Sequence, residues 1–202
     1  MPAPYELKTL YDEKRYEDVI AFSNDPQELD AFSIWDFTYC MNSLYRLQKY
    51  TEALELYKIF HKKYPASGDL DNKTCWCLYY TKVKSYDDET GDPANLLKNV
   101  DFIIKHSDNS PYSPKWKVVD LITKNVGSRW KRLALKCDDQ KQLQLINAVD
   151  PSTLSCDENI FQQADGKYRK VSSDREKWYS RKTKLLLKIE QYEECILCCN
   201  DA

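Results

Sequence analysis

The stretch that decides the fold is residues 34–65, IWDFTYCMNSLYRLQKYTEALELYKIFHKKYP. Part of its pattern occurs three times along the chain, as RYEDVIAF at 15–22, KYTEALEL at 49–56 and QYEECILC at 191–198. Each copy has a tyrosine, an acidic residue one or two positions later, and then a small or branched residue followed by an aliphatic one. Tyr16 and Tyr50 lie 34 residues apart, and so do Val19 and Ala53. Self-similarity at a fixed period of this length predicts stacked structural repeats.

A period of about 34 residues is that of the tetratricopeptide repeat, a pair of antiparallel helices that stacks on copies of itself. Residues 34–65 resemble the consensus of that family nearly end to end, with Met41 standing where the consensus prefers glycine. By this resemblance Tyr50 caps the turn between the helices, Ala53 lets them approach closely, and Pro65 ends the second helix. The resemblance assigns the inner face to Phe37, Cys40, Met41, Leu44, Tyr57 and Phe60. It implies an all-α, tetratricopeptide-like solenoid of antiparallel helix pairs.

The rest of residues 1–107 is expected to contain further repeats of this kind. Residues 3–24 form a shortened copy, and a third begins near Asn72 with a disturbed register. Two more helices are predicted where an N-cap residue precedes a proline, at Asp92-Pro93 and Ser113-Pro114. Proline suits the first helical position because its missing N–H has no partner to lose there.

Residues 108–172 are expected to form a divergent helical segment. DDQKQLQLINAVDP predicts a short helix that ends before Pro151. NIFQQADGKYRKV predicts a small β-hairpin at about 159–172, because the dipeptide Asp165-Gly166 suits a two-residue tight turn.

The last segment, residues 173–202, is expected to be a further, truncated repeat. Ser173 and Glu176 have the spacing of a capping box, which predicts a helix start. When this segment is aligned with the middle copy, Ala202 takes the position of Phe60, before the second helix would be complete. The alignment therefore predicts that the chain is the N-terminal part of a longer protein.

Three cysteines gather in this last copy. The same alignment places Cys195 at the position of Ala53 and Cys199 at that of Tyr57, while Cys198 is expected to face away from the core. Cysteine behaves as a small buried hydrophobe, and structural zinc would require four ligands from this region. The cluster is therefore interpreted as core, and neither a metal site nor a cofactor is predicted.

The sequence contains no recognisable catalytic signature. No phosphate-binding loop, dinucleotide fingerprint, nucleophile elbow or zinc-protease helix occurs. His61 and His106 lack a cysteine, serine or acidic partner at a characteristic spacing, so the protein is not expected to be an enzyme. The N-terminus is unlike a signal peptide and no apolar run is long enough to cross a bilayer. We expect a cytoplasmic protein with reduced thiols and no membrane partner.

Charge is distributed unevenly along the chain. Residues 1–30 carry eight acidic and three basic side chains, whereas residues 167–188 carry nine basic and two acidic ones. The helical spacing of four of these cations predicts one positively charged face, made of Lys177, Arg181, Lys184 and Lys188. A solvated helix face would explain charges of this kind, but such a face normally mixes signs. Arg181 and Lys184 are both expected to be exposed.

The family resemblance also suggests a binding groove on the first helix of each repeat. It implies groove positions at Trp35, Thr38, Asn42 and Tyr45 in the middle repeat, and at Lys177, Ser180, Lys184 and Leu187 in the last. Lys177 and Arg181 match two positions of the carboxylate clamp of some family members. Thr38 departs from that clamp, because a lysine belongs at its position.

Three functions compete on this basis. The leading hypothesis is a non-catalytic protein-binding scaffold that takes a peptide or an acidic partner in its groove. Fold alone does not establish it. The second is nucleic-acid binding through the basic helix at 175–188 and nearby cations and rings, namely Lys124, Arg129, Lys131, Arg132, Lys136, Trp130, Tyr168 and Trp178. The third is a regulatory domain of an enzyme whose catalytic part lies outside this sequence.

Overall fold

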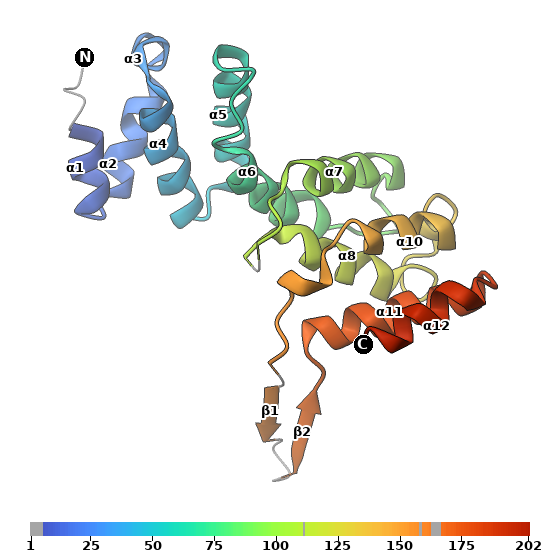
Figure 1. Cartoon of the computed structure of the whole chain (residues 1–202). Coiled ribbons are helices and arrows are strands. Elements are labelled where there is room, and N and C mark those ends of the chain that lie inside the picture. The colour runs from blue at the N-terminus through green and yellow to red at the C-terminus, as the bar shows by residue number, and fades with distance from the viewer. Residues whose placement is uncertain (1–5, 111, 158, 163–166) are drawn as a thin grey trace. The chain divides into compact units, whose positions relative to one another are not determined.

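The computed structural model is all-α apart from one short hairpin (Figure 1). It describes residues 6–110, 112–157, 159–162 and 167–202, and these ranges contain twelve α-helices. None of the helices in these ranges combines the length and the apolar character that a membrane span requires. The chain divides into two compact units, of which unit 1 comprises residues 1–85 and 99–107, and unit 2 residues 86–98 and 108–202.

Unit 1 is built from short helices joined by tight turns. In chain order it contains α1 (Glu6–Asp12), α2 (Tyr16–Ala21), the 3-10 turn η1 (Phe22–Asn24), α3 (Pro26–Ala31), α4 (Ile34–Arg46), α5 (Tyr50–Lys63), α6 (Asp71–Leu78) and the π-helical turn η2 (Tyr79–Val83). Helix α7 (Pro93–His106) contributes its second part, residues 99–106, to this unit. A capping box of Ser33 and Asp36 starts α4, since each side chain accepts the backbone N–H of the other residue.

The core of unit 1 is aromatic and centres on Phe37, which is fully buried. Its ring meets those of Phe32 at 5.3 Å and Phe60 at 5.5 Å in edge-on arrangements, which suit the quadrupoles of aromatic rings. Cys40 is also fully buried, and its thiol donates a hydrogen bond to the carbonyl oxygen of Val19 at 3.5 Å. The prediction that Cys40 is a core residue is confirmed.

One turn geometry occurs three times, at the positions that the sequence repeat marks. The positive-φ residues other than glycine are Lys14, Gln48 and Glu190 in the described chain, with φ of 61°, 59° and 62°. Each lies two residues before the tyrosine of a repeat copy. In each case the next residue donates its N–H to a carbonyl five positions back, as Lys49 does to Leu44 at 2.9 Å. This 6→1 bond closes a helix C-terminus in a Schellman-type turn.

The turn reverses the chain within three residues and brings the helices on either side of it together. It joins α1 to α2, α4 to α5, and α11 (Asp174–Lys188) to α12 (Tyr192–Asn200). The residue three positions after the repeat tyrosine is buried in every pair, as Val19, Ala53 and Cys195. Ala53 has no exposed surface, as the close helix contact predicted for it requires.

Unit 2 begins at residue 86 and includes the first part of α7. Its other elements are α8 (Pro114–Asn125), α9 (Lys131–Ala134), α10 (Asp139–Asn147), the 3-10 turn η3 (Pro151–Thr153), β1 (Asn159–Gln162), β2 (Tyr168–Val171), α11 and α12. The predicted starts of α7 and α8 are confirmed, because Asp92 and Ser113 accept N–H bonds from Ala94 and Lys115. The predicted capping box of Ser173 and Glu176 is present at the start of α11.

Two buried polar contacts organise unit 2. The indole of Trp178 donates a hydrogen bond to the carbonyl oxygen of Ile146 at 3.0 Å and so links α11 to α10. The Asp88 carboxylate accepts the backbone N–H groups of Arg132 and Leu133 at 2.7 Å and 3.0 Å, together with the Tyr86 hydroxyl. These hydrogen bonds hold the pKa of Asp88 below its usual value, although burial alone would raise it.

The predicted hairpin is present as two antiparallel strands. Asn159 pairs with Val171, and Gln162 pairs with Tyr168. The expected turn at Asp165-Gly166 lies outside the described residues. Residues 108–172 and 173–202, which were predicted as separate segments, belong to the same unit.

The cysteine pattern of α12 differs from the prediction. Cys195 is buried as expected, and its thiol donates to the carbonyl oxygen of Thr183 at 3.7 Å. Cys198 is buried as well, whereas Cys199 is exposed. The reason is helical spacing: the buried residues of α5 are Ala53, Leu56 and Phe60, and Cys198 is the counterpart of Leu56. Tyr57, the counterpart of Cys199, is itself only half-buried.

Replacing Ala53 by leucine tests the close contact between α4 and α5. Overpacking of a filled core should lower the free energy of unfolding of Ala53→Leu by about 1–3 kcal/mol, measured by urea titration. Ala66→Leu, at an exposed position beyond α5, is the control and should stay within about 0.5 kcal/mol of the parent. An Ala53→Leu variant as stable as the parent would contradict the contact.

Replacing Gln48 by glycine tests the left-handed turn. A left-handed conformation costs an L-residue about 1–2 kcal/mol, and glycine avoids this cost while losing more chain entropy on folding. Gln48→Gly should therefore raise the free energy of unfolding by about 0.5–1 kcal/mol. The same change at Gln144, an exposed residue inside α10, should lower it by about 1 kcal/mol. Equal losses at both positions would rule out strain at residue 48.

Candidate functional site

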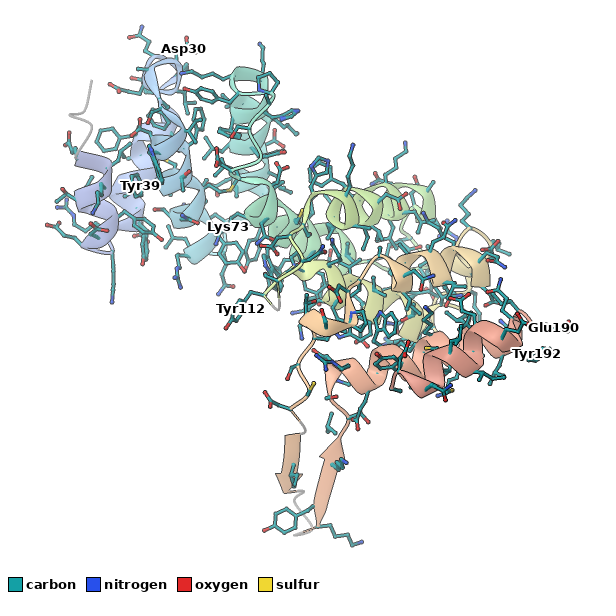
Figure 2. The ribbon with its side chains drawn as sticks, in the orientation of Figure 1. Asp30, Tyr39, Lys73, Tyr112, Glu190 and Tyr192 are labelled. Atoms are coloured by element: carbon teal, nitrogen blue, oxygen red, sulfur yellow. The ribbon has the colours of Figure 1, made fainter. Side chains whose placement is uncertain are left out.

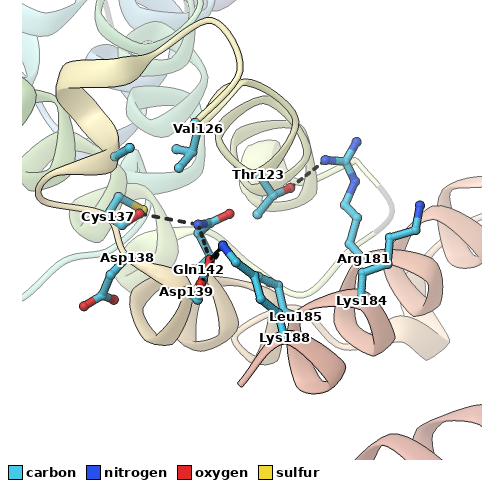
Figure 3. A pocket seen from close by; sticks show the side chains of 12 residues that line it. Thr123, Val126, Cys137, Asp138, Asp139, Gln142, Arg181, Lys184, Leu185 and Lys188 are labelled. Carbon is cyan, nitrogen blue, oxygen red and sulfur yellow. Dashed lines mark hydrogen bonds and ion pairs between the residues drawn. The ribbon is translucent and has the colours of Figure 1, made fainter. Parts of the chain in front are cut away.

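One cavity of unit 2 lies where α8 ends, α10 begins and α11 passes (Figure 3). It has a volume of about 430 Å³ and is open to solvent. Its lining includes three of the four cations predicted as a stripe on α11. The residues that line it are Thr123, Val126, Gly127, Ala134, Cys137, Asp138, Asp139, Gln142, Arg181, Lys184, Leu185 and Lys188. We refer to it as the α11 pocket.

The loop after α8 forms one wall of the α11 pocket. The Asn125 carbonyl oxygen accepts the backbone N–H groups of Arg129 and Trp130 at 2.9 Å each, which folds the loop back on the helix end. Gly127 sits in this loop with φ of 75°, a left-handed conformation that glycine adopts without strain. The side-chain amide of Asn125 donates to the carbonyl oxygen of Leu121 at 2.7 Å.

The start of α10 adds two carboxylates to the lining. Asp138 caps the helix by accepting the backbone N–H of Lys141 at 2.8 Å. Asp139 lies in the first helical turn, where a negative charge interacts favourably with the helix dipole. The amide of Gln142 donates to the carbonyl oxygen of Cys137 and to the Asp139 carboxylate, both at 3.4 Å (Figure 3).

Arg181 connects α11 to α8. Its guanidinium donates to the Asp120 carboxylate at 2.6 Å and to the Thr123 hydroxyl at 2.8 Å. Only 21% of the Arg181 side chain is exposed, so the expectation of an exposed residue here is wrong. A charge-assisted hydrogen bond at a partly buried position is a structural contact of unit 2.

Two other cations of the predicted stripe also have internal partners. Lys188 reaches Asp139 at 2.7 Å, and Lys177 reaches Asp174 at 2.9 Å. Burial alone would raise the pKa of Asp174, but hydrogen bonds from Lys177 and Trp116 bring it below its usual value.

Lys184 differs from the other three cations. It is exposed, it lines the α11 pocket, and no ion pair or hydrogen bond joins its ammonium to another side chain within the described part of the chain. Two of the three cations in the lining are paired, Arg181 with Asp120 outside the lining and Lys188 with Asp139 inside it. The site therefore offers one exposed lysine beside a mixed polar surface.

The four predicted groove residues of the middle repeat lie on α4, in unit 1, whereas the four predicted cations belong to unit 2. Trp35 is 69% exposed. Thr38 is half-buried, and its hydroxyl donates to the Ile34 carbonyl oxygen at 2.9 Å. Asn42 and Tyr45 are half-buried, and the ammonium of Lys73 from α6 lies 4.4 Å from the centre of the Tyr45 ring.

The residues proposed for nucleic-acid binding are only partly available. Trp130 and Trp178 are 8% and 5% exposed, so neither ring can stack on a base. The Arg132 guanidinium donates to the carbonyl oxygens of Asp88 and Glu89 at 2.9 Å and 2.6 Å. Tyr168 is exposed, as are the remaining cations Lys124, Arg129, Lys131 and Lys136.

One polar cluster in unit 1 has no signal in the sequence. His106 lies 2.9 Å from the Asp71 carboxylate through its Nδ1 atom, and the Tyr57 hydroxyl donates to the same carboxylate at 2.6 Å. No acidic partner of His106 is visible at a characteristic spacing in the sequence, and the structure supplies one from a distant position. Its partner lies 35 positions away and meets it only because α5, α6 and α7 pack together. Across the described residues no three His, Cys, Asp or Glu side chains are placed to share a metal ion.

No family model, curated protein or solved structure matches the chain.

Charge reversal at two neighbouring positions of α11 tests the different roles of Arg181 and Lys184. Arg181→Glu leaves Asp120 without its partner and should lower the free energy of unfolding in urea by about 1–3 kcal/mol. Lys184→Glu should stay within about 0.5 kcal/mol of the parent, because its side chain is exposed.

The exchange of the two charges provides the control. Adding Asp120→Arg to Arg181→Glu restores an ion pair of opposite direction and should recover part of the lost stability. Equal stability of Arg181→Glu and Lys184→Glu would contradict a structural role for Arg181.

Proposed function

We propose that the chain is a non-catalytic protein-binding module that takes an acidic group of a peptide or protein partner in the α11 pocket. In this proposal the helix pairs belong to a tetratricopeptide-like solenoid. Its support is the 34-residue interval between the first two copies and the left-handed turn that occurs at the same place in all three. Helical repeats of this kind commonly present extended binding surfaces.

The observation that carries the proposal is that Lys184 is exposed and forms no ion pair with a described side chain. Three cations around it already have carboxylate or hydroxyl partners, so they position the pocket wall and add little free positive charge. Lys184 is exposed beside the cavity, and its ammonium can donate to a carboxylate of a partner without disturbing the fold. A charge-assisted hydrogen bond of this kind is stronger than a neutral one.

The same geometry favours a peptide over a nucleic acid. A nucleic acid brings a regular array of phosphates and is bound by many cations along its backbone. In the α11 pocket Arg181 and Lys188 are already paired with Asp120 and Asp139, so the pocket offers no row of free cations that could follow a phosphate chain. A peptide can match both signs, because its side chains and backbone supply donors as well as acceptors.

Binding measured by fluorescence anisotropy tests this function. A labelled peptide with one glutamate among neutral residues is titrated with the full chain, next to its glutamine analogue. We expect the acidic peptide to bind more tightly and to lose affinity as salt is added, since salt screens exposed charges. Lys184→Glu should weaken binding about tenfold or more, because one charged hydrogen bond becomes a repulsion.

Two controls accompany this measurement: a charge reversal at another exposed lysine, and an oligonucleotide as an alternative ligand. Lys105→Glu makes the same change at an exposed position of α7 and should leave binding unchanged. Equal losses in Lys184→Glu and Lys105→Glu would mean that only net charge matters. If a single-stranded oligonucleotide binds more tightly than the peptide, with log affinity falling by about 0.7 per phosphate against log salt, nucleic-acid binding replaces the proposal.

A further inference from the structure

The three repeat copies differ in what covers the second helix of each pair. Helix α2 packs against α4, and the Cys40 thiol of α4 donates to the Val19 carbonyl oxygen of α2. Helix α5 packs against α6, and its Tyr57 hydroxyl donates to the Asp71 carboxylate. In the third copy α12 packs against α11, but Cys199, the counterpart of Tyr57, is exposed. A side of the helix that another helix covers in two copies is therefore uncovered in the third.

One position of the repeat measures this difference. Ile20, Leu54 and Ile196 each lie four positions after the repeat tyrosine, so they occupy the same side of their helices. Ile20 is 7% exposed and Leu54 is half-buried, whereas Ile196 is 62% exposed. The residue type stays aliphatic in all three copies, although only the first two have a covering helix.

The repeat tyrosine lies on this side as well. Tyr50 is half-buried and stacks on Tyr80 of η2, with ring centres 4.8 Å apart. Tyr192, labelled together with Glu190 in Figure 2, is exposed. The spacing of Tyr192, Ile196 and Cys199 places them on one side of α12, which we call the outer face of α12. Exposed apolar side chains that gather on one face mark an interaction site.

An acidic hollow adjoins the outer face where α12 begins. It has a volume of about 410 Å³ and is lined by Glu190, Gln191, Tyr192, Glu193 and Glu194. Glu194 is paired with Lys182 at 3.2 Å, whereas Glu190 and Glu193 are exposed. Helix α12 itself contains no lysine or arginine. The outer face is thus apolar along its length and negatively charged at one end.

We propose that the outer face of α12 binds an amphipathic helix of a partner protein, with an apolar stripe and a basic residue near one end. The packing of α4 on α2 and of α6 on α5 shows that this side of a repeat pair accepts a helix. The apolar stripe covers Tyr192 and Ile196, as in other complexes in which a helix lies in an apolar groove. The basic residue reaches the glutamates of the acidic hollow, which fixes the direction of the helix.

Charge argues against a second copy of this chain as the occupant. Two α12 helices packed through their outer faces would bring together only apolar and acidic residues, because α12 contains no cation. Like charges placed opposite each other in an interface are unfavourable. A partner helix that carries lysine or arginine avoids this repulsion.

The outer face shares no residue with the lining of the α11 pocket. Ile196→Glu should therefore leave binding of the acidic peptide to that pocket unchanged, and Lys184→Glu should leave binding of a helix to the outer face unchanged. The failure of one proposal is thus distinguishable from the failure of the other.

Fluorescence anisotropy with a labelled synthetic peptide tests the proposal on the full chain. The leucines of the peptide follow the helical period on one face, and its lysines occupy the other face. One control peptide has the same composition in an order without a helical period, and a second has glutamate at every lysine position. We expect saturable binding of the amphipathic basic peptide and at least tenfold weaker binding of both controls.

A matched pair of variants locates the binding site. Ile196→Glu should weaken the basic peptide about tenfold or more, because an apolar contact is lost. The added negative charge alone would attract that peptide, so a loss reports on the apolar face. Ile160→Glu makes the same change at an isoleucine of β1 that is 66% exposed, and should leave the affinity unchanged. Both variants should keep the urea midpoint of the parent, since both side chains are exposed.

Three results would overturn the proposal. The first is equal binding of the amphipathic peptide and the control without a helical period. The second is an affinity that Ile196→Glu leaves unchanged, or that Ile160→Glu lowers as much. The third is a full chain that dimerises without peptide in sedimentation velocity and becomes monomeric in Ile196→Glu, because a second copy then occupies the outer face.

Discussion

The left-handed residue between two consecutive helices is the constraint on which the helix pairs depend. A single residue of positive φ and one 6→1 hydrogen bond reverse the chain within three residues, so the second helix must return along the first. Each pair buries a small side chain three positions after the repeat tyrosine. These side chains are Val19, Ala53 and Cys195, none of which is larger than valine. The strained turn is retained because the packing of both helices holds it in place.

The α11 pocket owes its shape to pairing between charges. Arg181 is held by Asp120 and Thr123, and Lys188 is held by Asp139, so the walls contributed by α8, α10 and α11 are fixed to one another. The same pairing removes most of the positive field that the charge count of α11 suggests. The free positive charge that remains is that of one exposed lysine, Lys184, beside a polar cavity. A single free charge favours a partner with one acidic group over a polyanion.

Helical spacing predicts which charged residues share one face of a helix. It does not predict which oppositely charged residues of other helices pair with them. The carboxylates of Asp120 and Asp139 lie 61 and 49 positions before their partners on α11, and their spacing to those partners follows no local period. For the same reason the pairing of His106 with Asp71 has no sequence signal. Such contacts arise only when the helices pack, so a cation stripe read from sequence overstates the free charge of the folded protein.

The sequence by itself determined the helical class, the starts of α7, α8 and α11, and the positions of the repeat copies at which the turns occur. These features depend on local chemistry: a capping side chain such as Ser173, a proline at a first helical turn, and a small residue such as Ala53 at a fixed distance from a tyrosine. Tertiary structure alone decided that Cys198 is buried and Cys199 exposed, that the ring of Trp130 is enclosed, and which of the cations on α11 remains available. Burial and ion pairing depend on which faces of helices far apart in the sequence pack together. A local pattern of residues does not determine that packing.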